Sequence, residues 1–127
     1  MTTLTSALML IATLNAPVPA DPSAHVSVDD QPITVIATVK VKADSVDAFK
    51  KAALKMLALT RQEAGVISYD FNQGTNNPVE FSTIELWKSQ ADIDAHMSAP
   101  HMQEFFKEVG DLFEVAPSIV QYRKFEN

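Results

Sequence analysis

The amino-acid sequence predicts an α+β fold in which helices cover one face of an antiparallel sheet. Three observations support this prediction. Apolar and polar residues alternate over 33–41, 66–73 and 79–87, a period of two that is typical of half-buried strands. Apolar residues recur at helical spacing over 46–64 and again after residue 90. The 127 residues suffice for one domain with a core and are too few for two.

The first strand and the first helix are predicted over residues 33–41 and 46–64. The odd-numbered residues of the strand are apolar and are expected to face one side of the sheet. Asp44 and Ser45 favour a helix N-cap. Gly65 is typical of the position just after a helix, so the helix is expected to end at about residue 64.

The second and third strands are predicted over 66–73 and 79–87. Turn-forming residues fill positions 74–78 between them. We therefore expect the two strands to pair as a hairpin, with Ile67 and Tyr69 on the same face of the second strand.

A helical region and a last strand complete the chain. The helical region begins at 88–90, contains His96 and restarts at Pro100, because proline fits the first turn of a helix but not its interior. Pro117 ends this region, and residues 119–125 are predicted to form the fourth strand.

The order β-α-β-β-α-β is that of a ferredoxin-like domain. If both helices cover one face of the sheet, the other face keeps Ile36 together with Ile84 or Trp87 and Val120 or Tyr122, according to the register. Such an apolar face requires a cover. We expect a second copy of the chain to supply it, which gives a homodimer whose two sheets close into an α+β barrel.

Composition excludes several classes of function. The formal charge is −6, from 16 acidic and 10 basic residues. This surface repels phosphate backbones, so nucleic acid is not an expected partner. The chain has no cysteine, which excludes disulfides, thiolate nucleophiles and Cys-based metal sites.

Residues 1–32 read as a leader and linker that precede the domain at 33–125. The apolar run at 7–14 is too short to span a bilayer, and no membrane span is expected. Residues 18–20 resemble a signal-peptidase site, but no Lys or Arg precedes Lys40. The alternatives are an export signal, a disordered leader or a docked helix. A cytoplasmic location is favoured, and a periplasmic or secreted one follows if the segment is a signal peptide.

Three motifs carry a resemblance to a known family. They are E-x-G-x-x-x-Y at 63–69, E-x-W-x-S at 85–89 and A-H-x-x-x-P-H at 95–101. With these motifs in this order, the chain resembles the antibiotic biosynthesis monooxygenases and their quinol monooxygenase relatives. The resemblance implies a cofactor-independent enzyme that oxidises small electron-rich aromatics, such as quinols, with dioxygen. A fold does not name a reaction. The alternatives are a non-catalytic small-molecule-binding or stress-response dimer and an isomerase that acts by proton transfer in the same pocket.

Three residues are candidates for catalysis. His96 is the candidate general base, because an imidazole titrates near neutrality and can take a phenolic proton. Trp87 would form an aromatic wall of the pocket, and its alternative role is that of a core tryptophan. Glu85 shares a strand face with Trp87 and would fix either Trp87 or His96 in position.

Three further residues are candidates for substrate binding. Tyr69 shares a face with apolar residues, so a purely structural role in the core is its alternative. Asn72 points to the opposite face and is placed to reach the interior of the barrel. His101 lies in the first turn of the restarted helix, where its alternative roles are to cap the helix or to face solvent.

We expect no metal, haem or flavin. His96 and His101 are five residues apart across Pro100, a poor spacing for two ligands of one ion, and no third histidine or cysteine is near in sequence. In haem-degrading relatives, an asparagine on the first strand joins a tryptophan and a histidine, and the strand at 33–38 has none. The chain also lacks a G-x-G-x-x-G or Walker motif.

Overall fold

A computed structural model describes residues 31–126. Its elements are β1 (Ile33–Lys40), α1 (Val46–Thr60), β2 (Val66–Gln73), β3 (Glu80–Trp87), α2 (Gln90–Met97), α3 (Pro100–Val109), the 3₁₀ turn η3 (Gly110–Leu112) and β4 (Ser118–Tyr122). The predictions for the leader fall on residues 1–30, which lie outside this range. Within the described residues, every helix is too short or too polar to cross a membrane.

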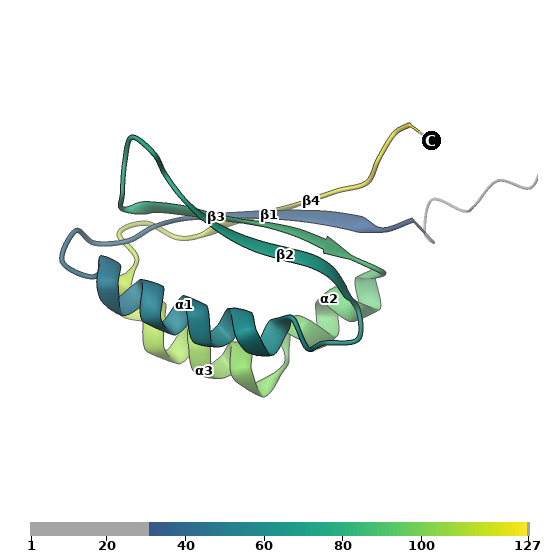
Figure 1. Ribbon diagram of the computed structural model, residues 1–127, viewed down its shortest axis with the longest axis horizontal. Coiled ribbons are helices and arrows are strands. Elements are labelled where there is room, and N and C mark those ends of the chain that lie inside the picture. Colours follow the sequence, from purple (N-terminus) through teal and green to yellow (C-terminus); the bar gives the residue numbers. More distant parts are fainter. Residues whose placement is uncertain (1–30, 127) are drawn as a thin grey trace, which may run out of the picture.

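The strands of the described range form one sheet in the order β2-β3-β1-β4, and each neighbouring pair is antiparallel. Figure 1 shows the sheet as one layer and the helices as a second layer against one of its faces. This arrangement confirms the predicted ferredoxin-like α+β fold, with the second helical region divided into α2 and α3.

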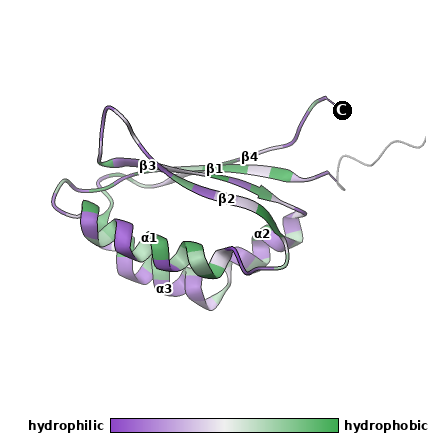
Figure 2. Cartoon of the chain, in the orientation of Figure 1, coloured by the Kyte–Doolittle hydropathy of each residue, from purple (hydrophilic) through white to green (hydrophobic). Residues whose placement is uncertain are grey.

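The hydrophobic core lies between the two layers. It contains the inward residues that the strand alternation predicts, among them Ile33, Val35 and Val41. Phe49 of α1 is at its centre, with its ring 4.8 Å from that of Phe81 and within 6.1 Å of three other aromatic rings. Figure 2 shows the apolar side of α1 turned toward the sheet. Sheet and helices are therefore held together by one continuous apolar layer.

Helix α1 ends at Thr60, four residues before the predicted end. After it the chain tightens, because the amides of Gln62 and Glu63 bond to carbonyls three residues back instead of four. Gly65 is required for a reason other than a helix stop. A Cβ at this position would overlap the side chain of Asp92, the first-turn acidic residue of α2.

The start of β2 differs from the predicted alternation. A register shift between Val66 and Ser68, where β2 pairs with β3, inserts one extra residue. As a result Val66 packs on the core and Ile67 is 47% exposed, although Ile67 was expected to share the face of Tyr69. Tyr69 itself is buried, as it would be in either role predicted for it.

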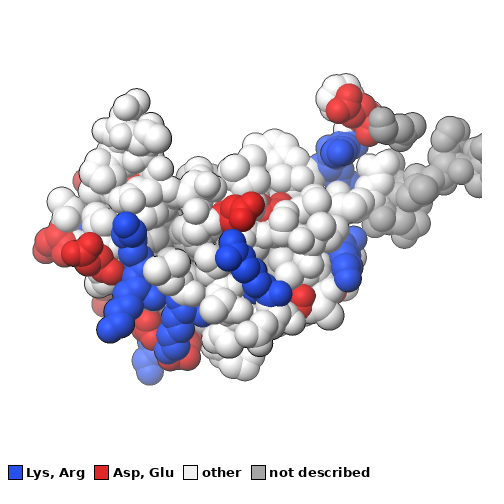
Figure 3. Space-filling view, in the orientation of Figure 1, with Lys and Arg blue, Asp and Glu red and all other residues white. Residues whose placement is uncertain are grey.

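The outer face of the sheet carries a row of apolar side chains. Ile84, Ile36 and Val120 lie opposite one another on β3, β1 and β4. Ile84 is 50% and Val120 43% exposed, and Tyr122 is exposed on the same strand. Trp87 instead points into the core, which settles the alternative left open by the sequence. Figure 3 shows most of the visible Lys and Arg side chains over the helical layer, with a further group beside the C-terminal end of the chain.

Strand β4 is shorter than predicted and spans Ser118–Tyr122. Its partner explains the length. In the antiparallel register Tyr122 already lies opposite Thr34, so β1 has almost no residues left with which to pair. Phe125, placed in the strand by the sequence prediction, is fully exposed.

Candidate active site

A cavity of about 250 Å³ lies between the inner face of the sheet and the helices α2 and α3. Most of its wall is apolar and includes Val35, Met102 and Phe105. The buried groups on the wall that can form hydrogen bonds are Tyr69, Thr83, Glu85 and His96. A mostly apolar cavity with a few converging polar groups is the usual form of a small-molecule site.

Glu85 is the buried carboxylate of this wall. Thr83, Glu85 and Trp87 are alternate residues of β3, so all three side chains point inward. The Thr83 hydroxyl donates a hydrogen bond to Oε1 of Glu85, and Trp87 Nε1 donates one to Oε2, each at 2.7 Å. These bonds compensate the burial of the charge, and Glu85 fixes the position of Trp87, one of the two partners that the sequence proposed.

Tyr69 lies opposite Glu85 across the β2–β3 pair. Burial, and then the neighbouring Glu85 carboxylate, raise the pKa of the Tyr69 phenol above its usual value. The phenol therefore keeps its proton at neutral pH and presents a hydrogen-bond donor beside the cavity.

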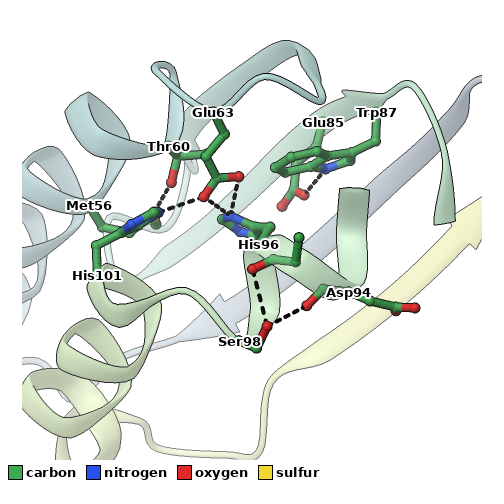
Figure 4. A network of polar contacts seen from close by, with 10 residues as sticks. Met56, Thr60, Glu63, Glu85, Trp87, Asp94, His96, Ser98 and His101 are labelled. Carbon is green, nitrogen blue, oxygen red and sulfur yellow. Dashed lines mark hydrogen bonds and ion pairs between the residues drawn. The ribbon is translucent and has the colours of Figure 1, made fainter. Parts of the chain in front are cut away.

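Trp87 is completely buried and does not line the cavity. Its ring packs against that of His96, with centroids 4.6 Å apart. In a single chain, Trp87 therefore has the alternative role predicted for it, that of a core tryptophan, and is not part of the cavity wall. Trp87 lies behind the wall, where its ring packs on His96 and its Nε1 donates a hydrogen bond to Glu85 (Figure 4).

His96 lies in the last turn of α2 and is 3% exposed. Its Nδ1 is 3.0 and 3.2 Å from the two carboxylate oxygens of Glu63. Because an ionised carboxylate only accepts hydrogen bonds, the proton of a neutral His96 belongs on Nδ1. Nε2 then carries the lone pair, and no side chain of residues 31–126 bonds to it. The imidazole forms part of the cavity wall.

His101 is the second residue of α3 and contacts the same carboxylate. Its Nε2 lies 2.7 Å from Oε1 of Glu63, and Figure 4 shows Glu63 between the two imidazoles. His101 does not line the main cavity, so the substrate contact proposed for it is not direct. Its side chain is largely buried, neither facing solvent nor bonded as a cap.

The argument against a metal from the spacing of His96 and His101 does not hold. On one continuous helix, residues five apart point about 140° away from each other. The chain instead breaks between α2 and α3, and a ring nitrogen of each histidine and a carboxylate oxygen of Glu63 lie within 4.8 Å of one another. Glu63 belongs to the E-x-G-x-x-x-Y motif, but the sequence did not identify it as a site residue.

Asn72 is remote from this group. It is exposed on β2 and makes only 3.5 Å contacts to the backbone oxygens of Asp70 and Ser82. It does not line the cavity within one chain. The structure therefore brings together His96, Trp87, Glu85 and Tyr69, adds Glu63 and His101 behind them, and leaves Asn72 outside.

Comparisons with known proteins identify the family and the fold of the chain. The family model of the antibiotic biosynthesis monooxygenases matches residues 32–108. An uncharacterised protein of Synechocystis is 31% identical over 94 residues, which are 74% of this chain and 64% of that protein. The match thus spans less than two thirds of this relative's length.

Two further proteins link the family to named or solved members. A Mycobacterium tuberculosis protein with the provisional name of monooxygenase is 30% identical over 81 residues, which are 64% of this chain and 79% of that protein. A solved structure from Nitrosomonas europaea, provisionally described as an antibiotic biosynthesis monooxygenase, has a TM-score of 0.73 at 24% identity. The likeness covers 80% of this chain and 96% of that one, and it supports the fold alone.

Proposed function

The chain belongs to the antibiotic biosynthesis monooxygenase family, and on this premise we propose that it is a cofactor-independent monooxygenase of small electron-rich aromatics such as quinols. One observation carries the proposal. His96 lines a mostly apolar cavity, and Glu63 holds its Nδ1 so that Nε2 is left as a proton acceptor. The cavity is slightly smaller than the usual range for ligand pockets, about 300 to 1,000 Å³, which favours a small substrate.

In the proposed first step, His96 Nε2 takes the phenolic proton of the bound quinol. Glu63 stabilises the imidazolium that forms, as the carboxylate of a catalytic triad does. The apolar wall excludes water and keeps the phenolate beside dioxygen. Trp87 packs on the imidazole and restricts its orientation.

The oxidation then balances without an outside reductant. The phenolate gives one electron to dioxygen, and the resulting aryloxyl radical and superoxide recombine to form a carbon–oxygen bond. The ring carbon loses its hydrogen as the O–O bond breaks and water leaves. A quinol and dioxygen thus yield a hydroxyquinone and water, and the substrate supplies all four electrons. The imidazolium returns its proton to the departing oxygen.

Oxygen uptake in metal-chelated buffer tests the proposal and separates it from its alternatives. We expect uptake above autoxidation, with one dioxygen consumed per quinol. Uptake equal to autoxidation for a panel of quinols would favour the non-catalytic binding dimer. Conversion of a substrate without oxygen uptake would favour the isomerase, which could use the same imidazole for proton transfer.

We also propose that two copies of the chain associate through the outer face of the sheet. The in-register row of Ile84, Ile36 and Val120 supports this proposal, since an exposed apolar patch of this kind usually marks an interface. Light scattering at micromolar concentration should give about twice the 13.9 kDa mass of the chain. The Ile84→Lys variant should shift the protein toward monomer, because β3 would then place a charge in the interface. A monomeric wild-type protein would overturn the proposal.

A further inference from the structure

Behind the cavity, Glu63, His96 and His101 converge from the turn after α1, the end of α2 and the start of α3. We propose that these three residues bind one divalent transition-metal ion. We further propose that the ion inhibits the enzyme, a step that depends on the function proposed above. The metal would thus be a regulator of His96 and not a cofactor.

The spacing of the three ligand atoms suits a metal ion. Oε1 of Glu63 lies 3.0 Å from His96 Nδ1 and 2.7 Å from His101 Nε2. At the usual metal–nitrogen and metal–oxygen distances of about 2.0–2.2 Å, neighbouring ligand atoms are about 2.9–3.5 Å apart. The two ring nitrogens lie within 4.8 Å of each other, so side-chain rotations would bring all three atoms into one coordination sphere.

The state of His101 is an independent observation that points to a ligand. Its Nε2 is buried and has no aligned hydrogen-bond partner within the described residues, despite the short distance to Glu63. Within the described residues, a proton on this nitrogen has no acceptor along its axis, and a lone pair on the same axis has no donor. A buried polar atom in this state requires an explanation, for which a bound ion is one of the recognised candidates.

The chemistry of the three side chains restricts the ion. Two imidazoles and one carboxylate suit Zn²⁺ and the neighbouring first-row divalent ions, whereas Mg²⁺ and Ca²⁺ prefer oxygen ligands. Three protein ligands would leave at least one coordination position for water. We therefore expect Zn²⁺ and Co²⁺ to bind, with Mg²⁺ excluded.

Binding at this position would change the tautomer of His96. A neutral imidazole that coordinates a metal through Nδ1 keeps its proton on Nε2. The nitrogen next to the cavity would become a donor and could no longer accept the phenolic proton. The ion would also engage Glu63, the group that otherwise stabilises the imidazolium.

A Co²⁺ titration of the full chain, followed by visible absorption, tests the site without any activity measurement. We expect saturation at one ion per chain. Added Zn²⁺ should displace the bound Co²⁺ and abolish its visible absorption. Glu63→Gln and His101→Ala should each weaken binding by about tenfold or more, because the first replaces the anionic ligand with a neutral amide and the second removes an imidazole. His25→Ala and Glu104→Gln are matched controls and should bind like wild type. His25 is the third histidine of the chain, and Glu104 is a carboxylate in an exposed ion pair with Lys55.

Two results would overturn the site: no saturable Co²⁺ spectrum, or binding that survives in both ligand variants. Circular dichroism of each variant checks that a loss of binding is not a loss of fold. Inhibition is tested separately, as the ratio of oxygen uptake with and without Zn²⁺. This ratio should be low in wild type and return toward one in His101→Ala. An unchanged ratio in wild type would overturn the inhibition. A protein that turns over no quinol would overturn the proposed function, whereas the Co²⁺ titration would still decide the site.

Discussion

Replacing Trp87 with phenylalanine would remove the Nε1 donor from Glu85 and keep an aromatic ring in the core. The bond is 2.7 Å long. Both residues are buried, since Trp87 is 0% and Glu85 6% exposed. Water is therefore poorly placed to replace the lost donor. The Glu85 carboxylate would keep the hydrogen bond from the Thr83 hydroxyl but lose the one from the indole.

The expected cost follows from these contacts. A hydrogen bond to a charged group contributes about 1.5–3 kcal/mol, and the smaller ring adds a packing loss of about 1 kcal/mol. We expect the free energy of unfolding to fall by about 2.5–4 kcal/mol. For a domain of this size, the melting temperature would fall by at least about 10 °C.

A double-mutant cycle with Glu85→Leu, which removes both acceptor oxygens, separates the hydrogen bond from the packing. Unfolding in urea should be followed by circular dichroism, because Trp87 is the only tryptophan and its fluorescence is lost in the variant. Protein concentration must be held constant, since association would contribute to the measured stability. We expect a coupling energy of about 1.5–3 kcal/mol. A coupling below about 0.5 kcal/mol would mean that the Trp87–Glu85 bond does not organise this wall.

Three further predictions concern single residues. His96→Ala should lower kcat by about 10²–10⁴ with the fold intact, whereas His101→Ala, which does not line the cavity, should change kcat much less; the reverse order in steady-state assays would identify the wrong histidine. Gly65→Ala should destabilise the fold by about 1–3 kcal/mol through its overlap with Asp92, and Asp92→Ala should restore much of the loss in a thermal melt. The Tyr69 phenol has a raised pKa in the folded state, so the unfolded chain releases this proton first and stability should fall as pH rises above about 10. Urea titrations should show a weaker fall in Tyr69→Phe, and an equal slope would contradict the burial argument.

The order of the elements along the chain and the core could be predicted from the sequence because both follow from local periodicity. Alternation fixed the inward face of β1, and the polar turn before Pro78 fixed the hairpin. The failures occur where one extra residue or one tight turn changes the geometry. Ile67 faces outward because of a single bulge in β2, which apolar alternation does not reveal.

The candidate site was predicted in part. His96, Glu85 and Tyr69 lie on the cavity wall, but Trp87 lies behind it, because the sequence gives the face of a strand and not the depth of a side chain. Glu63 was missed because it lies 33 residues from His96 in sequence. The two side chains meet only because α1 ends early, at Thr60.

The central claim is that His96 initiates insertion of one oxygen atom into an aromatic substrate, and an isotope measurement with ¹⁸O₂ tests it most directly. The quinol is oxidised in metal-chelated buffer under ¹⁸O₂. Mass spectrometry of the products should find one ¹⁸O atom in the hydroxyquinone and the other in water. Product formation by His96→Ala should fall toward the background of autoxidation. Unlabelled quinone formed with an equal amount of hydrogen peroxide would contradict monooxygenation, and labelled product formed at the wild-type rate by His96→Ala would contradict the role of His96.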